Sequence, residues 1–263
     1  MTAQGRHNPS SGGIRITWLG HASVLLEIGG VRIVTDPVLR DRVGVLRRRR
    51  DLPAVDDIGP LDAVLLSHLH HDHADLPSLR RLEEAPVLSA AENAAWVRRQ
   101  GLRAPALDPT RWHAVGDDVE VRIVPAVHDA RPMPHRPNGA VGMLVRGHGV
   151  VVWFAGDTAL YPAMADLPEL AGARVDLALL PVGGWGPRLS AGHMGPEEAA
   201  RAAELAGAYS VVPIHYGTLH PRGWPATRLD WTTEPGRRLP AALAEHSDAR
   251  AHVLAVGASL TVG

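Results

Sequence analysis

The feature that most constrains this chain is an apolar run that ends in a cluster of histidines. Residues 62–68 read DAVLLSH and predict a buried strand, because a short, continuous apolar run is typical of strands inside a sheet. Four of the six residues from His68 to His73 are histidine, and a fifth is Asp72. The cluster is typical of a metal site, with a solvated histidine-rich loop or an accidental metal-binding tract as the alternative.

Three further strand-like segments have a residue of the metal-ligand type at or near their ends. They are residues 119–128, ending at His128, residues 140–157, ending at Asp157, and residues 210–217, which contain His215. Taken singly, each histidine is more often an ordinary hydrogen-bonded or exposed residue, and Asp157 could belong to a turn. Because strand ends meet at one edge of the sheet in layered α/β folds, their joint occurrence predicts one shared site.

Composition limits which metals and which chemistry this site can support. The chain of 263 residues has no cysteine, which excludes disulfides and thiolate ligands and leaves histidine and carboxylates. Such ligands favour zinc, manganese or iron over Cu(I) or an iron–sulfur cluster. All 27 basic residues are arginine, so lysine chemistry is excluded. The net charge of −1 gives no general bias toward nucleic acid or an anionic membrane.

The ends and the hydropathy of the chain predict a cytoplasmic protein. No run of about 18 apolar residues exists, so no membrane-spanning helix is expected. Residues 1–13 lack the apolar core of a signal peptide and are predicted to be a disordered lead-in. Residues 14–263 contain no clear linker and are predicted to form a single domain.

The pattern of apolar runs predicts an α/β fold of two sheets with helices packed outside. An antiparallel meander is expected over residues 14–18, 24–28 and 31–35, which glycines separate. The other expected strands are residues 62–68, 119–128, a hairpin over 140–157, 175–184, 210–217 and a closing strand pair near 252–262. Helices are expected over residues 75–84, 90–101, 195–208 and near 237–245.

The spacing within the cluster divides its residues between two ions. Alternate residues of an extended or tightly turning loop can point the same way, so His68 and His70 can bind one ion. Asp72 and His73 follow one turn later and can bind a second ion, while His71 points away from both.

Asp157 and the two later histidines can complete this pair of sites. Asp157 lies in the stretch AGDT, whose small residues allow a carboxylate to approach closely. One carboxylate can bridge two ions that lie about 3.5–4 Å apart. His128 could complete the shell of the first ion, and His215 the shell of the second.

These motifs resemble those of a known family. SHLHHDHADL resembles the HxHxDH signature of the metallo-β-lactamase superfamily, and His128, Asp157 and His215 follow in the order that the family uses. Residues 16–39 resemble the opening of the branch that contains N-acylphosphatidylethanolamine phospholipase D-like and ascorbate-6-phosphate lactonase-like hydrolases. FAGDT (154–158), LLPVGGWGPR (179–188), HMGPEEAARA (193–202) and IHYGT (214–218) resemble the phospholipase D-like members in particular.

The resemblance implies an αββα sandwich of two mixed sheets with a dinuclear site on one edge. It implies one ion on His68, His70 and His128, and a second ion on Asp72, His73 and His215. Asp157 would bridge the two ions. Histidine at position 70, where oxygen-reducing di-iron relatives typically carry glutamate, favours hydrolysis over redox chemistry. The histidine-rich set favours two zinc ions, with manganese or iron as alternatives.

The mechanism expected from such a centre is attack by a metal-bridging hydroxide on the phosphorus atom of a phosphoryl group or on the carbon atom of a carbonyl group. Asp72 would orient the hydroxide and accept its proton. His193, in the glycine-flanked stretch AGHMG, is the candidate proton donor to the leaving group. The alternative for His193 is a helix-capping or exposed loop residue.

Other residues are candidates for supporting roles. Asp36 is expected to orient the ligand imidazoles, unless it merely starts a turn with Pro37, and Thr158 and Ser67 are weaker candidates for the same role. Five residues on flanking loops could line the substrate pocket or simply pack: His21, His135, Trp185, Tyr216 and His220. The run RRRR at residues 47–50 is expected to be a solvated loop rather than a contact to an anionic substrate.

Three functions compete at this stage. A dinuclear hydrolase acting on a phosphodiester-type small molecule leads, because the C-terminal motifs resemble the phospholipase D-like members. A lactonase using the same site is the alternative, and a metal-stabilised binding protein without turnover is a second alternative. A nuclease would need a basic surface, and only one short arginine run exists, so no nucleic-acid partner is expected. A homo-oligomer is left open.

Overall fold

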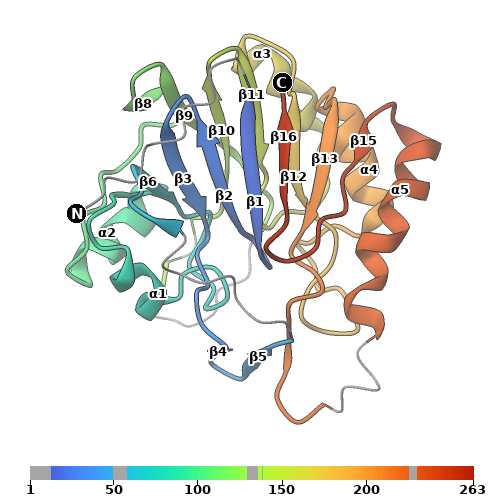
Figure 1. Ribbon diagram of the computed structural model, residues 1–263, viewed down its shortest axis with the longest axis horizontal. Helices are drawn as coiled ribbons and strands as arrows, with labels where there is room; N and C mark the ends of the chain where they lie inside the picture. Colours follow the sequence, from blue (N-terminus) through green and yellow to red (C-terminus); the bar gives the residue numbers. More distant parts are fainter. Residues whose placement is uncertain (1–12, 50–57, 129–135, 138, 225–229) are drawn as a thin grey trace, which may run out of the picture.

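Two mixed β-sheets face each other in this protein, with helices on their outer sides (Figure 1). The computed structural model describes residues 13–49, 58–128, 136–137, 139–224 and 230–263. The predicted lead-in over residues 1–13 lies outside this description except for Gly13. The layered arrangement agrees with the predicted αββα sandwich.

The first sheet combines the predicted antiparallel meander with two parallel strands. Its order in the described residues is β16 (Ser259–Val262), β1 (Ile14–Gly20), β2 (Ser23–Ile28), β3 (Val31–Thr35), β6 (Ala63–Leu65) and β7 (Val87–Leu88). Strand β6 is shorter than the predicted 62–68, because the chain leaves the sheet before it reaches the histidine cluster. The parallel pairing of β3 with β6 places the two segments that follow these strands side by side.

The second sheet provides three further segments for the same edge. Its order is β15 (Arg250–Ala251), β13 (Ser210–Ile214), β12 (Leu177–Pro181), β11 (Val150–Phe154), β10 (Val141–Gly147), β9 (Val119–Pro125) and β8 (His113–Gly116). Strands β11, β12 and β13 are parallel and buried along their whole length, as expected for central strands covered on both faces. The prediction that a strand pair near residues 252–262 closes the chain is wrong, because β15 joins this sheet whereas β16 pairs with β1 of the first sheet.

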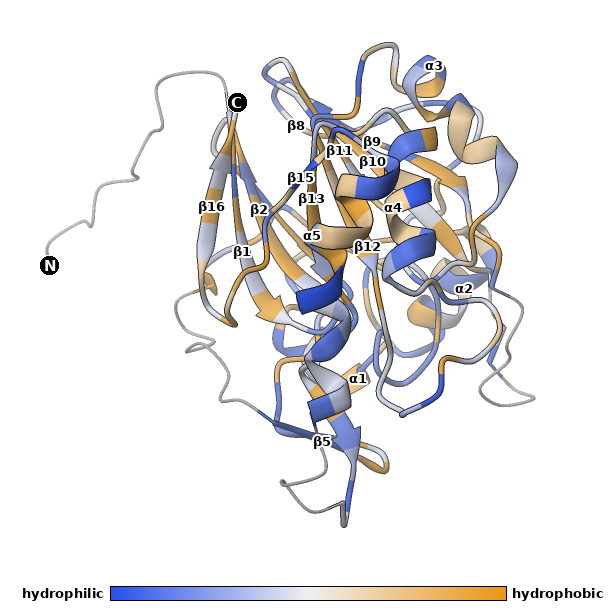
Figure 2. Ribbon diagram, turned by 90° about the vertical axis from the view of Figure 1, so that its right-hand side faces the viewer, coloured by the Kyte–Doolittle hydropathy of each residue, from blue (hydrophilic) through white to orange (hydrophobic). Residues whose placement is uncertain are grey.

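Helices cover the outer faces of the two sheets. The described helices are α1 (Leu76–Arg81), α2 (Ala91–Arg99), η2 (Pro162–Asp166), α3 (Leu167–Ala171), α4 (Pro196–Leu205), η4 (Asp230–Thr232) and α5 (Glu234–His246). Apolar residues of α1 and α2 pack on one face of the first sheet, and those of α3, α4 and α5 belong to the same buried cluster as the strands of the second sheet. Figure 2 shows α4 and α5 beside the hydrophobic strands of the second sheet. None of these described helices has the length and apolarity needed to cross a bilayer.

A small third sheet projects from the main body and was not predicted. It consists of β14 (Leu219–Pro221), β5 (Leu46–Arg48) and β4 (Arg42–Val43), and it lies at the lower edge in Figure 1. The predicted solvated loop of residues 47–50 is wrong for Arg48, which is 5% exposed. Its guanidinium donates to the carbonyl oxygens of Leu19 at 3.0 Å and Val38 at 2.5 Å, whereas Arg47 is exposed and Arg50 lies outside the described residues.

Replacement of Arg48 should therefore destabilise the fold. Arg48→Met removes the donors of two buried carbonyls, and we expect a loss of about 2–4 kcal/mol in the free energy of unfolding. Arg47→Met, on the exposed side of the same strand, is the matched control and should leave the unfolding transition unchanged. Urea denaturation of the two variants measures this difference, and equal stability of both would contradict a structural role for Arg48.

Candidate metal centre

The histidine cluster forms a tight turn between β6 and α1. The amide nitrogens of His73 and Ala74 both donate to the carbonyl oxygen of His70, at 3.1 and 2.7 Å. Asp75 then caps the N-terminus of α1 by accepting a hydrogen bond from the amide of Ser78 at 3.2 Å. This turn separates His68 and His70, which belong to one group of ligand atoms, from Asp72 and His73, which belong to another.

The first group of ligand atoms contains the three residues expected for the first ion, together with the expected bridging residue Asp157. His68, His70, His128 and Asp157 each offer one ligand atom, and these atoms all lie within 4.8 Å of one another. The Nε2 atom of His128 lies 3.1 Å from Nδ1 of His70. Nε2 of His68 lies 3.8 Å from Oδ2 of Asp157.

The second group contains the residues expected for the second ion, together with His21. Asp72, His73, His215 and His21 also offer ligand atoms within 4.8 Å of one another. Oδ2 of Asp157 lies 3.1 Å from Nε2 of His73 and 3.2 Å from Nε2 of His215, so this carboxylate stands between the two groups. His71 is half-buried and belongs to neither group.

The ring nitrogens of four histidines are oriented by hydrogen bonds on the side away from the centre. Nδ1 of His128 lies 2.9 Å from the carbonyl oxygen of Gly192, and Nδ1 of His215 lies 2.9 Å from that of Gly183. Because a carbonyl oxygen only accepts, both Nδ1 atoms donate a proton to it, and Nε2 is the ring nitrogen that each histidine turns toward the centre.

Asp36 and Ser67 orient the other two histidines in the same way. Oδ2 of Asp36 accepts from Nδ1 of His73 at 2.6 Å and from the Ser67 hydroxyl at 2.5 Å. The Ser67 hydroxyl oxygen in turn lies 2.9 Å from Nδ1 of His68. Asp36 thus connects one histidine of each group, and this type of outer contact fixes ligand imidazoles in metal sites.

The donor set fits a metal ion. Nε2 of His68 and both carboxylate oxygens of Asp157 are buried and make no hydrogen bond within the described residues. Buried polar atoms in native proteins normally have a partner, and a bound metal ion would be a suitable partner for these three atoms. Imidazole nitrogens and carboxylate oxygens without thiolates suit zinc, manganese or iron.

The charges of the site also favour a cation. Burial raises the pKa of Asp157, but the imidazoles of His215 and His73 outweigh burial and hold that pKa well below its usual value. Burial lowers the pKa of His215, but the Asp157 carboxylate beside it outweighs burial and raises that pKa to about 9. Burial, followed by the charge of His73, holds the pKa of His68 well below its usual value. The ionised Asp157 carboxylate therefore lies beside the positively charged imidazole of His215 and the neutral imidazole of His68 in a buried space.

Backbone strain is concentrated at this site. Among the described residues, five non-glycine residues have positive φ, and three of them belong here: His21 at 54°, Asp36 at 31° and His215 at 60°. Gly156 also has a positive φ of 61°, and a Cβ atom at this position would lie 2.6 Å from Cβ of Ser67. Strained conformations of this kind persist where the surrounding structure enforces them, commonly at functional sites.

The remaining predicted site residues lie in varied surroundings. The Thr158 hydroxyl accepts a hydrogen bond from the Val127 amide at 2.9 Å and donates one to the Ala159 carbonyl at 2.8 Å. Both partners are main-chain atoms, and neither is a ligand imidazole. His193 is half-buried, and its Nε2 atom lies 3.2 Å from Oδ2 of Asp157.

The expected substrate-lining residues are mostly buried by packing. Tyr216 stacks on Trp18 with ring centroids 5.2 Å apart, and His220 is buried in β14 beside the Pro221 carbonyl. Trp185 is 42% exposed and is the predicted lining residue with a large accessible surface. His21 is buried against Asp72 instead of facing a substrate, and His135 lies outside the described residues.

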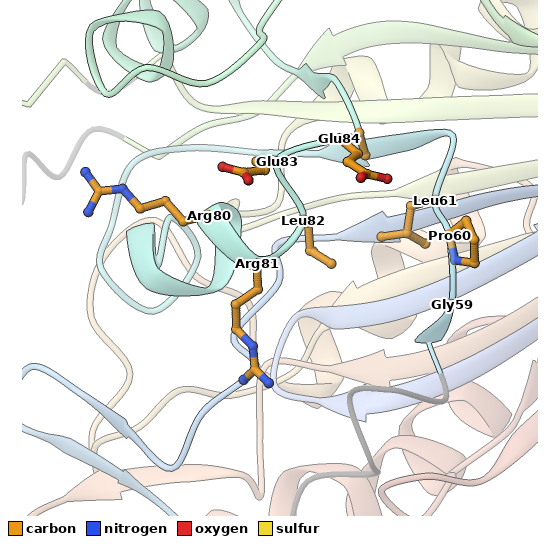
Figure 3. A pocket seen from close by; sticks show the side chains of 9 residues that line it. Gly59, Pro60, Leu61, Arg80, Arg81, Leu82, Glu83 and Glu84 are labelled. Carbon is orange, nitrogen blue, oxygen red and sulfur yellow. The ribbon is translucent and has the colours of Figure 1, made fainter.

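A shallow hollow elsewhere on the surface contains none of these residues. It is lined by Gly59, Pro60, Leu61 and the segment from Arg80 to Ala85 at the end of α1 (Figure 3). Its lining holds no histidine or aspartate, so the metal-type ligands gather at the histidine turn and not here.

Comparison with known proteins identifies the family. Residues 31–216 match the sequence profile of the beta-lactamase superfamily domain, a range that includes every residue of the two ligand groups except His21. The chain belongs to this family. A UPF0173 metal-dependent hydrolase from Thermococcus kodakarensis is 31% identical over 218 residues, which cover 82% of this chain and 88% of that relative. The family and the ligand groups together suit the binding of a divalent metal ion by histidine and aspartate.

Two further relatives differ in length from this chain. An uncharacterized protein of Mycobacterium tuberculosis is 32% identical over 241 residues, which cover 84% of this chain but 64% of that relative. The chain therefore spans less than two thirds of the length of this relative. The N-acyl-phosphatidylethanolamine-hydrolyzing phospholipase D 1 of Caenorhabditis elegans is 28% identical over 263 residues, covering 91% of this chain and 72% of that protein.

Solved structures share the fold. Igni18, a metallo hydrolase from the archaeon Ignicoccus hospitalis, matches with a TM-score of 0.72 and 24% identity, over 95% of this chain and 98% of that one. An isothiocyanate hydrolase from Delia radicum gut bacteria matches with a TM-score of 0.71 and 20% identity, over 94% and 98%. At these identities the likeness concerns the sandwich architecture alone.

Single substitutions in the histidine turn should separate ligands from bystanders. We expect His70→Ala and His73→Ala each to lower the metal content of the purified protein, because each removes a nitrogen from one ligand group. His71→Ala, within the same turn, is the matched control and should keep the wild-type metal content. Inductively coupled plasma mass spectrometry measures this content, and metal loss in His71→Ala would contradict the assignment.

Proposed function

We propose that this chain is a dinuclear metal-dependent hydrolase that acts on a phosphodiester-type small molecule. The observation that carries this proposal is the orientation of four histidines, each of which holds Nδ1 on an outer acceptor and turns Nε2 inward. Those four are His68, His73, His128 and His215. They surround one buried carboxylate, Asp157, whose oxygens make no hydrogen bond within the described residues.

The two ligand groups supply the two proposed ion sites. One ion would be held by His68, His70 and His128, and the other by Asp72, His73 and His215, with Asp157 between them. Zinc suits this histidine-rich set best, and manganese or iron would also fit. When bound, the two ions supply an activated hydroxide and stabilise the negative charge that develops on the substrate.

The residues of the chain would position the reacting groups and move protons. Asp72 has two carboxylate oxygens, so one can bind the ion while the other accepts the proton of the attacking hydroxide. His193 lies at the rim of the site with Nε2 3.2 Å from Oδ2 of Asp157. We assign to this nitrogen the proton that the leaving group needs.

The loop from Gly183 to His193 would bind the substrate above the ions. Hydrogen bonds fix both ends of this loop to the centre. The carbonyl oxygen of Gly183 accepts from Nδ1 of His215, and that of Gly192 accepts from Nδ1 of His128. Between these ends Trp185 and Leu189 are each 42% exposed. This loop therefore offers an apolar surface for the non-reacting part of a substrate, which is the role proposed for Trp185.

A phosphodiester substrate is supported by the similarity to the phospholipase D 1 of Caenorhabditis elegans at 28% identity. The same centre could also open a lactone ring, because both reactions need a nucleophile and stabilisation of a developing oxyanion. A binding protein without turnover is the alternative from another class.

A substrate screen with metal removal tests the proposed function. We expect purified protein to hydrolyse a model phosphodiester such as bis(p-nitrophenyl) phosphate, to lose this activity with chelator, and to regain it with Zn²⁺ or Mn²⁺. Turnover of lactones alone would replace the phosphodiester assignment with a lactonase. Two bound ions without turnover of either substrate class would favour the binding protein.

The role of His193 has its own test. We expect His193→Ala to lower kcat by about 10²–10⁴-fold, because the leaving group loses its proton donor, while the metal content stays at the wild-type level. His148→Ala, in the exposed turn between β10 and β11, is the control and should retain wild-type turnover. Wild-type kcat in His193→Ala, or loss of its metal, would show that His193 has another role.

A further inference from the structure

His21 is the fourth member of the second ligand group and is buried in the turn between β1 and β2. Its amide donates to the Thr218 hydroxyl oxygen at 2.7 Å. Its carbonyl oxygen accepts from Nε1 of Trp18 at 3.0 Å and from the amide of His215 at 3.0 Å. These three bonds hold the residue in a left-handed conformation, with φ 54°, that non-glycine residues rarely adopt.

This rigid backbone directs the imidazole toward Asp72. The side chain is 1% exposed, and its Nε2 atom lies 3.0 Å from Oδ2 of Asp72. The nearest ring nitrogens of His215 and His73 lie farther from the same oxygen, at 3.7 and 3.9 Å. The His21 ring also packs on the ring of His215, with centroids 4.1 Å apart. Of these three imidazoles, that of His21 is therefore the closest to Oδ2 of Asp72.

Two roles are compatible with this position. His21 could be a further ligand of the second ion, because its Nε2 atom lies within the same 4.8 Å group as those of Asp72, His73 and His215. Alternatively, it could donate a hydrogen bond to Asp72. The two roles exclude each other, because a ring nitrogen that carries a proton has no lone pair for a metal.

The chemistry of Asp72 favours the donor role. A carboxylate that ligates a metal must be ionised, and an ionised carboxylate accepts hydrogen bonds but cannot donate them. The 3.0 Å contact to Oδ2 is a hydrogen-bond distance, and in such a bond the proton is on Nε2 of His21. The orientation is opposite to that of His73 and His215, which donate through Nδ1 to groups outside the centre.

We propose that His21 is a positioning residue that donates its Nε2 proton to Oδ2 of Asp72 and does not bind metal. This bond fixes the direction of the carboxylate and keeps a coordination position of the second ion open for the nucleophile or substrate. Catalytic metal sites need such an open position, whereas a site closed by protein ligands is structural. The inference rests on the proposed dinuclear function and assigns a role to a residue outside its ligand set.

Paired substitutions of similar volume distinguish the two roles. His21→Gln keeps an N–H donor at nearly the same reach, and His21→Leu fills the space without a donor. We expect His21→Leu to weaken binding of one of the two Zn²⁺ ions by about 10–100-fold, and His21→Gln to stay within about threefold of wild type. Competition titrations with a chromophoric chelator measure both affinities. His252→Gln, the same change at a distance from the site, is the matched control and should behave as wild type.

The outcomes separate this inference from the proposed function. Equal weakening in His21→Gln and His21→Leu would show a lost ligand and overturn the donor role, and unchanged affinity in both would show a purely structural residue. Fewer than two ions on wild-type protein would overturn the dinuclear function and this inference together. Two ions on wild type, with only the His21 variants departing from expectation, would overturn the inference alone.

A measurement on the wild-type protein covers the case in which His21→Leu does not fold. In protein loaded with ¹¹³Cd²⁺, a ligand imidazole shows scalar coupling between its ring protons and the metal. We expect such coupling for His73 and His215 and none for His21, whose Nε2 should appear as a protonated nitrogen. Cadmium coupling to the His21 ring would overturn the proposal without any substitution.

Discussion

The structure depends on one buried carboxylate that requires positive charge. Asp157 follows β11 and is 2% exposed, and the Nε2 atoms of His73, His193 and His215 lie 3.1–3.2 Å from its Oδ2 atom. An isolated buried carboxylate is costly unless cations or strong donors surround it. Histidines from both sheets converge on Asp157, and their Nε2 atoms face it because their Nδ1 atoms are bound elsewhere. The two sheets are thus joined at this edge by histidines that gather around one buried carboxylate.

This constraint explains why the strained and close-packed residues gather here. The first sheet contributes Asp36 and the histidine turn, and the second contributes the segments after β9, β11 and β13. Left-handed conformations at Asp36 and His215, and the close approach of Gly156 to Ser67, allow chain segments to turn sharply at the ends of their strands. Local strain is the cost of bringing side chains from separate strands to one point.

The sequence predicts the parts of the site that depend on local pattern. Apolar strands followed by ligand-type residues were enough to predict that His68, His128, Asp157 and His215 converge, because strand ends meet at a sheet edge. The role of Arg48 and the burial of Tyr216 depend on the third sheet and on α5, whose positions no local pattern indicates. The contact between His21 and Asp72 joins residues that are 51 positions apart and depends on a left-handed turn. Only the glycine before His21 hinted at that turn.

The central claim is that two ions lie on either side of Asp157, and anomalous diffraction from crystals of the metal-loaded protein tests it most directly. Data collected above and below the zinc absorption edge should show two peaks about 3.5–4 Å apart. One peak should lie among His68, His70 and His128, and the other among Asp72, His73 and His215. A single peak, or a second peak away from Asp157, would contradict the account.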